Sequence, residues 1–184
     1  ARRLFAGVPE GNSLALPAEH PVFRRVAMGS HADLLTIERE WDPKRKKIRS
    51  EIVVDDVRRI AGFLHRTAAE GGWRVVVVDG AETLNSNAEN ALLKVLEEPP
   101  PRAVLLLVCS APGRLLPTIR SRCRRLRLSA LDDASMAVLL AGYLPELSAD
   151  ERGRLATLAE GSPGRAMLLA EEEGLKIAAL VDKV

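Results

Sequence analysis

The sequence is poor in aromatic residues and in cysteine, and it lacks any long apolar run. Aromatic residues make up 3% of the 184 positions although 47% are hydrophobic, so the core must be aliphatic. Two cysteines, Cys109 and Cys123, do not make a disulfide framework. No apolar stretch approaches the ~20 residues needed to span a bilayer, and the opening ARRLFAG lacks the apolar segment of a signal peptide. We therefore expect a cytoplasmic globular chain with no membrane partner.

No sign of charge dominates, because 27 basic and 25 acidic residues leave a net charge of +2. One polar segment, residues 41–50, is nevertheless locally basic, through Lys44, Arg45, Lys46, Lys47 and Arg49. Such a run can contact nucleic-acid phosphates. It has no interleaved aromatic residues to stack on bases, so a flexible solvated loop is the favoured interpretation and DNA contact the alternative.

A phosphate loop of the form GxxxxGK[S/T] is absent from the sequence. In that motif, backbone N–H groups and the lysine surround the β- and γ-phosphates of a nucleotide. We therefore expect that this chain alone does not bind ATP tightly, and we predict no cofactor bound by it.

The segment 74–101, RVVVVDGAETLNSNAENALLKVLEEPPP, is the part around which the chain is organised. The apolar run 75–78 predicts a strand buried on both faces of a parallel sheet. It ends in Asp79, and the carboxyl end of such a strand is where α/β sheets place ligand chemistry. Ser86 and Glu89 form a capping-box pattern that opens a helix, which the prolines at 99–101 end.

Similar patterns predict the remaining elements. Strands are expected at 33–38, 103–109 and 124–128, the second of them buried on both faces. Helices are expected at 20–29, from Asp55 or Asp56 to about Glu70, and from Pro117. After Ser129 three short helices follow: 133–144, one led by Ser148 and Glu151, and one capped by Ser162. The pattern therefore predicts an α/β domain over 1–129 and a small helical domain over 130–184.

Two motifs resemble a known family. The helix ending in ALLKVLEEPP and the segment 115–123, LLPTIRSRC, are similar to those of AAA+ clamp-loader subunits of bacterial DNA polymerase III. The resemblance covers the middle half of the chain. It implies an α/β fold, an AAA+-like three-layer P-loop NTPase domain with a parallel sheet, whose phosphate-loop segment would precede Ala1. A small helical lid domain would follow.

The resemblance also implies roles for individual residues. In the triplet Ser121, Arg122 and Cys123, Arg122 would act in trans as an arginine finger on the γ-phosphate held by a neighbouring ATPase subunit. Ser121 would orient the loop and Cys123 would pack below it. The alternative is that Arg120, Arg122, Arg124 and Arg125 form a solvated basic turn.

Three further positions match family sites that surround a nucleotide. Asp79 lies at the Walker B position, Ser110 at the sensor-1 position and Arg165 at the sensor-2 position. Each has a structural alternative. Asp79 and Ser110 would then cap the turns that follow their strands, and Arg165 would be a surface charge.

The sequence departs from the family pattern in two places. An active AAA+ ATPase has a second acid after the Walker B acid, whereas here Gly80 follows, which cannot act as a base; Glu82 is expected to face elsewhere. Many clamp-loader subunits carry zinc-binding cysteines before the first strand, whereas residues 11–31 contain none. We predict no metal site, with His31 as a turn residue.

The resemblance thus implies a non-catalytic structural subunit that helps to load the sliding clamp onto primed DNA in DNA replication. Its partners would be gamma/tau ATPase subunits, the delta subunit and the sliding clamp, with ATP and Mg²⁺ held at the neighbouring subunit. The alternative is a gamma/tau-type ATPase truncated before its P-loop, against which Gly80 and the missing cysteines argue. Another AAA+ ATPase, such as a Holliday-junction motor, is a more distant alternative.

Overall fold

The computed structural model describes residues 1–7, 16–70 and 72–171. The chain divides into two compact units, Ala1–Arg125 and Leu126–Val184, and each is described here by itself. The sequence pattern placed this boundary after Ser129. The strand predicted at 124–128 is wrong, because residues 124–130 carry neither helix nor strand. Leu126 and Leu128 alternate as a strand would require, but they are 83% and 85% exposed, and neither residue belongs to a sheet.

A parallel sheet forms the centre of the first unit. Its strands are β1 (Leu34–Ile37), β4 (Arg74–Asp79) and β5 (Ala103–Val108), in the order β1-β4-β5. Both neighbours of β4 run parallel to it. Val75, Val76 and Val78 have no exposed surface, so the strand predicted from the apolar run at 75–78 is confirmed as the buried centre of the sheet.

The last strand, β5, is less buried than its sequence predicts. Leu106 and Val108 are 40% and 51% exposed, whereas Leu105 and Leu107 pack against the core. Successive side chains of a strand point to opposite faces. In the described residues, β5 is therefore covered on one face only. A continuous apolar run is compatible with burial on one face or on both, so the sequence alone does not decide between them.

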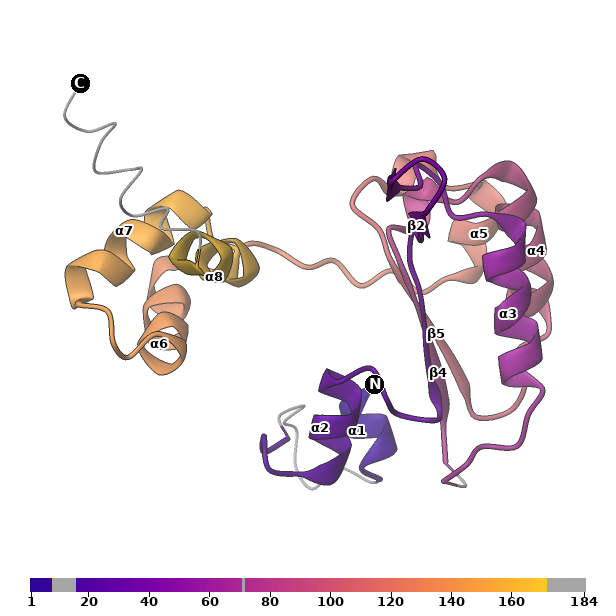
Figure 1. Cartoon of the computed structure of the whole chain (residues 1–184), viewed down its shortest axis with the longest axis horizontal. Helices are drawn as coiled ribbons and strands as arrows, with labels where there is room; N and C mark the ends of the chain where they lie inside the picture. Colours follow the sequence, from indigo (N-terminus) through magenta and orange to yellow (C-terminus); the bar gives the residue numbers. More distant parts are fainter. Residues whose placement is uncertain (8–15, 71, 172–184) are drawn as a thin grey trace. The chain divides into compact units, whose positions relative to one another are not determined.

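Helices lie on both sides of the sheet. Figure 1 shows α3 (Val54–Leu64), α4 (Ser86–Glu97) and α5 (Pro117–Arg122) together on one side, with α1 (Arg2–Phe5) and α2 (Pro21–Ala27) on the other. Two short 3-10 turns, η1 (Ala81–Thr83) and η2 (Pro112–Arg114), follow β4 and β5. The main core lies between the sheet and the α3–α5 side and is aliphatic, as the composition predicts; its largest fully buried side chains include Ile37, Ile52, Ile60, Val76, Leu92 and Ile119.

The helix α3 begins earlier and ends earlier than its sequence predicts. Its N-cap is Val53, and Asp56 reaches back to accept a hydrogen bond from the Val53 N–H at 3.0 Å. The helix ends at Leu64 rather than near Glu70. The buried Arg74 guanidinium donates to the carbonyls of Leu64 and Arg66, which satisfies backbone acceptors that a longer helix would have used itself.

The helix α4 also uses a different cap from the predicted one. Asn85 is its N-cap and accepts from the Ala88 N–H at 3.0 Å. The predicted capping box of Ser86 and Glu89 does not form, because the buried Glu89 side chain instead accepts from the Leu116 N–H at 3.0 Å. A tertiary contact that ties α4 to the start of α5 has thus replaced a local one.

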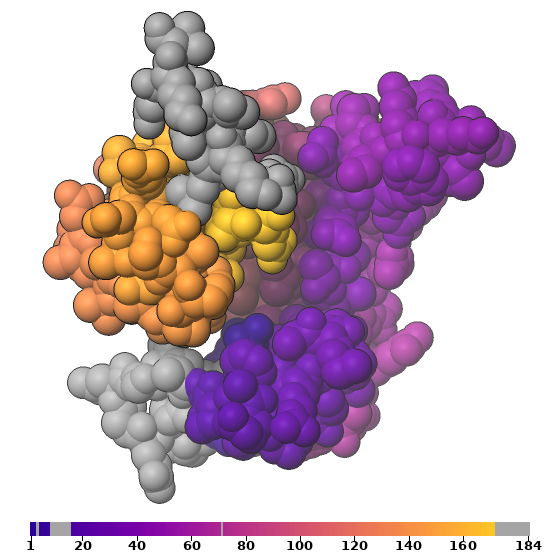
Figure 2. All heavy atoms as spheres, turned by 60° about the vertical axis from the view of Figure 1, so that its left-hand side comes forward, coloured from indigo at the N-terminus to yellow at the C-terminus, as the bar shows by residue number. Residues whose placement is uncertain are grey.

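The basic segment 41–50 folds rather than remaining a loop. It contains an antiparallel hairpin of β2 (Trp41–Asp42) and β3 (Lys47–Ile48), in which Trp41 pairs with Ile48 and Asp42 with Lys47. The hairpin follows β1 and stands out from the surface of its unit, in purple at the upper right of Figure 2. We refer below to residues 41–48 as the basic hairpin.

The second unit is a helical bundle of α6 (Asp133–Tyr143), α7 (Ala149–Ala159) and α8 (Pro163–Glu171). Met136, Leu140, Leu155 and Ala166 form its buried core. The predicted capping box is confirmed, since the Ser148 hydroxyl accepts from the Glu151 N–H at 3.3 Å and the Glu151 carboxylate accepts from the Ser148 N–H at 2.8 Å.

The connection between α7 and α8 is tight. Gly161 has a φ of +74°, and its carbonyl accepts from the Leu131 N–H at 2.8 Å. Ser162 accepts from the Arg165 N–H at 3.4 Å, with Pro163 first in α8, as predicted.

Within the described residues, no helix is long and apolar enough to cross a membrane. The last part of the helical domain predicted over 130–184, residues 172–184, lies outside the described residues.

Candidate functional site

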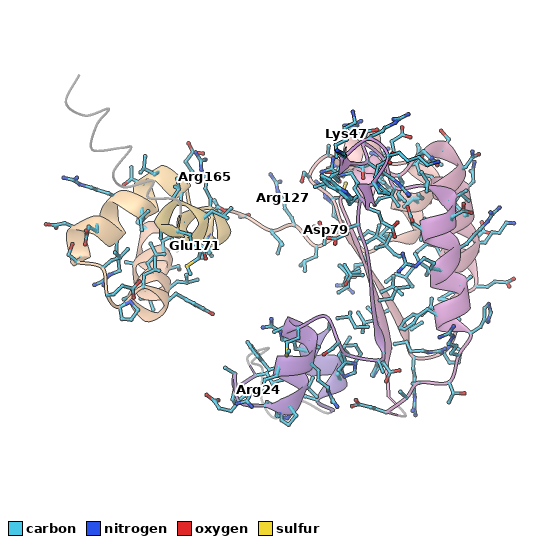
Figure 3. The ribbon with its side chains drawn as sticks, viewed as in Figure 1. Arg24, Lys47, Asp79, Arg127, Arg165 and Glu171 are labelled. Atoms are coloured by element: carbon cyan, nitrogen blue, oxygen red, sulfur yellow. The ribbon has the colours of Figure 1, made fainter. Side chains whose placement is uncertain are left out.

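Asp79 ends the central strand at the carboxyl edge of the sheet, where its side chain is exposed (Figure 3). Gly80 follows in the left-handed region, with φ +74° and ψ +46°. Its carbonyl accepts hydrogen bonds from the Thr83 N–H at 2.8 Å and the Thr83 hydroxyl at 2.7 Å, which closes the turn η1. The position that would carry a second acid is therefore a turn residue whose backbone conformation favours glycine.

Glu82 faces the end of the neighbouring strand, contrary to the expectation that it faces elsewhere. Its carboxylate accepts from the Ser110 N–H at 3.3 Å. Burial opposes ionisation of Glu82, but hydrogen bonds from its own N–H, from the Cys109 thiol and from Ser110 together hold its pKa below the ordinary value. The 3-10 turn η1 directs the Glu82 side chain toward Ser110. The sequence pattern predicts only a turn at this position, so it does not predict this contact.

Ser110 and Cys109 therefore occupy the same edge as Asp79. Ser110 is exposed and follows β5, which pairs with β4 so that Asp79 lies opposite Val108. Burial raises the pKa of the Cys109 thiol, and the adjacent Glu82 carboxylate raises it further. Within the described residues, the Asp79 carboxylate at this edge accepts no hydrogen bond, whereas the Glu82 carboxylate is already hydrogen-bonded.

Arg122 is the last residue of the short helix α5, which Pro117 opens as predicted. Its guanidinium donates to the Glu97 carboxylate at 2.9 Å and to the Thr118 carbonyl at 3.1 Å. The Arg122 and Glu97 side chains are 37% and 50% exposed, so the ion pair lies at the surface. Its guanidinium is therefore accessible to a neighbouring molecule.

The two other residues of the triplet support this helix end. The Ser121 hydroxyl donates to the Thr118 carbonyl at 3.0 Å, within α5. Cys123 is half-buried against the core, and burial raises the pKa of its thiol. Arg120, Arg124 and Arg125 are exposed around Arg122.

The structure does not bring Arg122 to the edge that carries Asp79. Glu89, near the start of α4, contacts the start of α5, whereas Glu97, at the end of α4, contacts Arg122 at the end of α5. Both helices therefore lead away from the carboxyl edge. The 12 residues of α4 rise about 18 Å, which exceeds the length of an arginine side chain. Arg122 therefore does not reach the carboxyl edge of its own sheet.

Arg165 lies in the second unit, near the start of α8. Its guanidinium pairs with the Glu160 carboxylate at 3.0 Å, and the two side chains are 54% and 77% exposed. The sensor-2 role remains a prediction.

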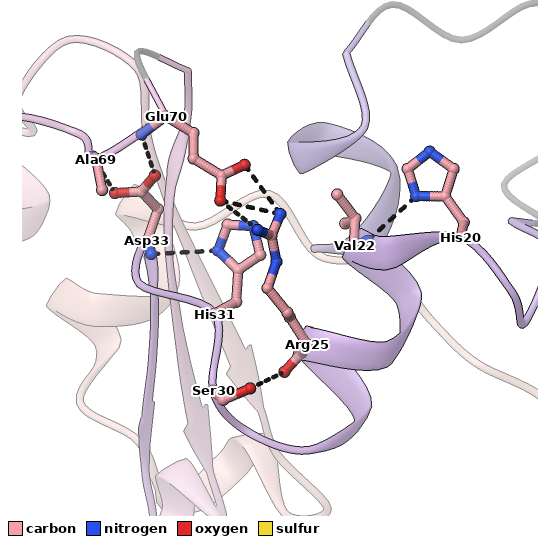
Figure 4. Close-up of polar contacts among 8 residues, drawn as sticks. All are labelled: His20, Val22, Arg25, Ser30, His31, Asp33, Ala69 and Glu70. Atoms are coloured by element: carbon pink, nitrogen blue, oxygen red, sulfur yellow. Dashed lines mark hydrogen bonds and ion pairs between the residues drawn. The ribbon is translucent and has the colours of Figure 1, made fainter.

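A polar cluster at the opposite edge joins α2 to the sheet (Figure 4). The buried Asp33 carboxylate accepts from the N–H groups of Ala69 and Glu70 at 2.8 and 3.1 Å. Glu70 pairs with Arg25 at 2.9 Å. The sequence pattern predicts Asp33 as the start of a strand. It does not predict that the Asp33 carboxylate binds the backbone at Ala69 and Glu70.

His31 belongs to the same cluster and is buried. Its Nδ1 accepts from the Asp33 N–H at 3.2 Å, so its Nε2 carries the proton and faces the Glu70 carboxylate at 3.8 Å. Its ring stacks on Phe5 with centroids 3.9 Å apart. Within the described residues, no group of His, Cys, Asp and Glu side chains is arranged to hold a metal ion.

Comparisons with known proteins agree with this architecture. Residues 7–132 match the model of the family described as DNA polymerase III, delta subunit. The chain belongs to this family. It is 44% identical to DNA polymerase III subunit delta' of Pseudomonas aeruginosa, over 75% of this chain and 40% of that protein. It is 38% identical to the delta' subunit of Escherichia coli, over 77% of this chain and 40% of that protein.

Members of the related tau type are also similar. The tau subunit of Escherichia coli is 32% identical over 81% of this chain and 22% of that protein. The chain spans less than half the length of the curated relatives it matches. The predicted resemblance to subunits of bacterial DNA polymerase III is confirmed by the family match and by the delta' identities of 44% and 38%.

Solved structures confirm the predicted AAA+-like fold. A gamma subunit-related protein from Thermotoga maritima aligns with a TM-score of 0.51 and 29% identity, over 76% of this chain and 47% of that chain. The RuvB Holliday junction branch migration motor of the same organism aligns with a TM-score of 0.56 over 86% of this chain and 51% of that chain. At 16% identity, the second match concerns the fold alone.

Proposed function

We propose that this chain belongs to a non-catalytic clamp-loader subunit that supplies Arg122 in trans to ATP bound by a neighbouring ATPase subunit. The observation that carries the proposal is the position of Arg122. It lies at the surface end of α5, while Asp79 lies beyond the other end of α4. A guanidinium held there serves a nucleotide outside this chain more readily than one at its own sheet edge.

The chemistry suits a phosphoryl-transfer partner. During ATP hydrolysis, negative charge spreads over the equatorial oxygens of the transferred phosphoryl group, and a planar guanidinium can offset it with paired hydrogen bonds. The Glu97 carboxylate occupies the same donors in the isolated chain, so docking would exchange one anionic partner for another. The γ-phosphate would be held with its Mg²⁺ by a gamma/tau-type ATPase subunit.

The same geometry supports a non-catalytic role for this chain. A hydrolytic site needs a base that orients the attacking water. Gly80 has no side chain, and the nearby Glu82 is hydrogen-bonded to Ser110. Asp79 and Ser110 would therefore be remnants of a nucleotide edge, and this subunit would bind no cofactor of its own.

The wider role follows from the family. In the assembled complex, with gamma/tau subunits and a delta subunit, the chain would help to load the sliding clamp onto primed DNA during replication in the cytoplasm. The tau similarity keeps one alternative, a gamma/tau-type ATPase, which hydrolysis by the full-length subunit alone would support.

The test uses the full-length subunit assembled with its ATPase partner. Arg122→Ala should lower the kcat of partner-dependent ATP hydrolysis by about 10³-fold or more, as loss of a trans arginine does. Arg122→Lys should recover little, because an ammonium lacks the planar fork. Arg120→Ala is the matched control, since Arg120 is exposed on the same helix, and it should leave kcat unchanged. Unchanged kcat for Arg122→Ala, with folding and assembly intact, would overturn the proposal.

A further inference from the structure

The basic hairpin has a defined turn rather than a mobile tip. The Asp42 carboxylate accepts from the N–H groups of Lys44 and Arg45 at 2.9 and 3.2 Å. The hydrogen bond from the Arg45 N–H, with that from Lys44 and the nearby guanidinium groups, holds the pKa of Asp42 below its ordinary value. Lys46 closes the turn with a φ of +51°. The basic side chains are therefore displayed from a fixed backbone.

Acidic neighbours neutralise the base of the hairpin. Arg49 lies within 3.8 Å of Glu40 and 3.9 Å of Asp56, and Arg59 pairs with Glu40 at 2.8 Å. These ion pairs link the hairpin to α3. Because Glu40 and Asp56 are engaged at the base, they do not compensate the charges further out.

The tip of the hairpin keeps its positive charge. Lys44, Lys46 and Lys47 are exposed and form no ion pair within the described part of the chain. Arg45 is 75% exposed and has only a 3.8 Å contact with Asp42. Four cations therefore stand together in solvent. Two carboxylates lie near them: Asp42, which is hydrogen-bonded to the turn, and the exposed Glu51, which lines the same surface hollow as Arg45 and Lys47. This arrangement attracts a polyanion.

The strands of the same hairpin also carry an exposed apolar pair. Trp41 and Ile48 face each other across the two strands and are 59% and 56% exposed. Tryptophan offers a flat surface on which an unpaired base can stack. The basic run at 44–49 contains no aromatic residue. Trp41 lies outside the run in sequence and contacts it by pairing with Ile48.

We propose that the basic hairpin is a DNA-binding element, in which Lys44, Arg45, Lys46 and Lys47 contact backbone phosphates and Trp41 contacts an unpaired base or its sugar. Lysines make undirected charge contacts, so binding would not depend on sequence. The proposal rests on the proposed function, in which the complex acts on primed DNA, and it assigns a surface for that partner. The hairpin follows the carboxyl end of β1, and Figure 3 shows Lys47 and Asp79 at the same end of the sheet.

The test measures binding of fluorescein-labelled primed-template DNA to the assembled complex, by anisotropy over a range of salt concentrations. The variant is Lys44→Gln, Arg45→Gln and Lys47→Gln together; Lys46 is kept because of its left-handed backbone. Each lost phosphate contact reduces the slope of log K against log salt by about 0.9 on duplex DNA, so the slope should become shallower by roughly two to three. The Kd should weaken by at least about tenfold near 0.1 M salt.

A control variant removes the same charge elsewhere. Arg24→Gln, Arg58→Gln and Arg154→Gln together neutralise three exposed arginines outside the hairpin and should leave the slope unchanged. Trp41→Ala should weaken binding to the single-stranded template by about fivefold or more without changing the slope, because stacking is not a charge contact.

The hairpin variant also separates this inference from the proposed function. It should keep assembly and partner-dependent ATP hydrolysis without DNA, whereas Arg122→Ala should keep DNA binding and lose hydrolysis. Equal Kd and slope for the hairpin variant and the unsubstituted complex would overturn the inference. Loss of sliding-clamp binding with unchanged DNA affinity would also overturn it, by assigning the surface to an acidic protein.

Discussion

The ion pair between Arg122 and Glu97 makes a quantitative prediction about the trans arginine. In the isolated chain the guanidinium is held by a carboxylate 2.9 Å away, and it must leave that partner to reach a nucleotide. Both side chains are more than a third exposed, so solvent screens the pair and its contribution is at most about 1 kcal/mol. Removing Glu97 should therefore favour the docked position by no more than a factor of about five.

Glu97→Ala is the direct perturbation. It removes the acceptor, and because Glu97 is the last residue of α4, losing a negative charge there does not destabilise the helix dipole. The expected result is a two- to fivefold rise, roughly, in partner-dependent ATP hydrolysis at subsaturating subunit, measured with the full-length protein and its ATPase partner.

The matched control is Glu98→Ala, the next residue, which is also exposed and makes no ion pair within the described residues. It should leave hydrolysis unchanged. A fall in hydrolysis with Glu97→Ala would refute the reasoning, because Glu97 would then position Arg122 for its work instead of competing for it. A rise well beyond about tenfold would show that the pair is stronger than a screened surface contact.

Three stability predictions concern single contacts. Gly161→Ala should destabilise the helical unit by about 3 kcal/mol in urea unfolding, because a Cβ there would press on the Leu131 backbone and come within 2.8 Å of Ala130 Cβ. Gly80→Ala has the same φ of +74°, but its Cβ would meet only Thr83 side-chain atoms at 3.6 and 3.8 Å, so it should cost only about 1 kcal/mol. Equal losses would contradict the assigned clash. Asp33→Ala should cost about 1–3 kcal/mol in thermal unfolding, since it leaves two partly buried N–H groups without their acceptor, and Asp33→Asn should cost less. Hydrogen bonds from Ser148 lower the pKa of Glu151, so their stabilising effect is present above the ordinary value of 4.5 and is lost as the pH falls through the folded-state pKa. The loss of unfolding free energy caused by Ser148→Ala should therefore be smaller near pH 3 than near pH 7. An equal loss at both pH values would show that the carboxylate is not involved.

Local patterns in the sequence were sufficient for the elements whose determinants are local. The apolar run of β4, the proline that opens α5 and the capping box of α7 each lie within a few residues of the structure they specify. The proline of LLPTIRSRC predicted a helix from Pro117, and the structure ends that helix at Arg122. These features depend on backbone sterics and short-range hydrogen bonds, which any chain with the same residues would share.

Tertiary contacts decided the features that the sequence did not show. Glu89 binds the start of α5 instead of capping its own helix. Arg74 donates to the carbonyl of Leu64, the last residue of α3, and to that of Arg66 beyond the helix. Strand pairing alone brings Trp41 opposite Ile48, at the other end of the basic run. Each of these partners lies several to many positions away in the chain, so no local window contains both members of the contact.

The left-handed turn at Gly80 has a consequence for how this subunit could change over evolution. Any side chain placed there would have to adopt a backbone conformation that costs about 1–2 kcal/mol for residues other than glycine. A glutamate at this position would therefore carry that backbone cost before it could act as a base. Under the proposed function, regaining hydrolysis would thus require a change in the turn as well as a new acidic side chain.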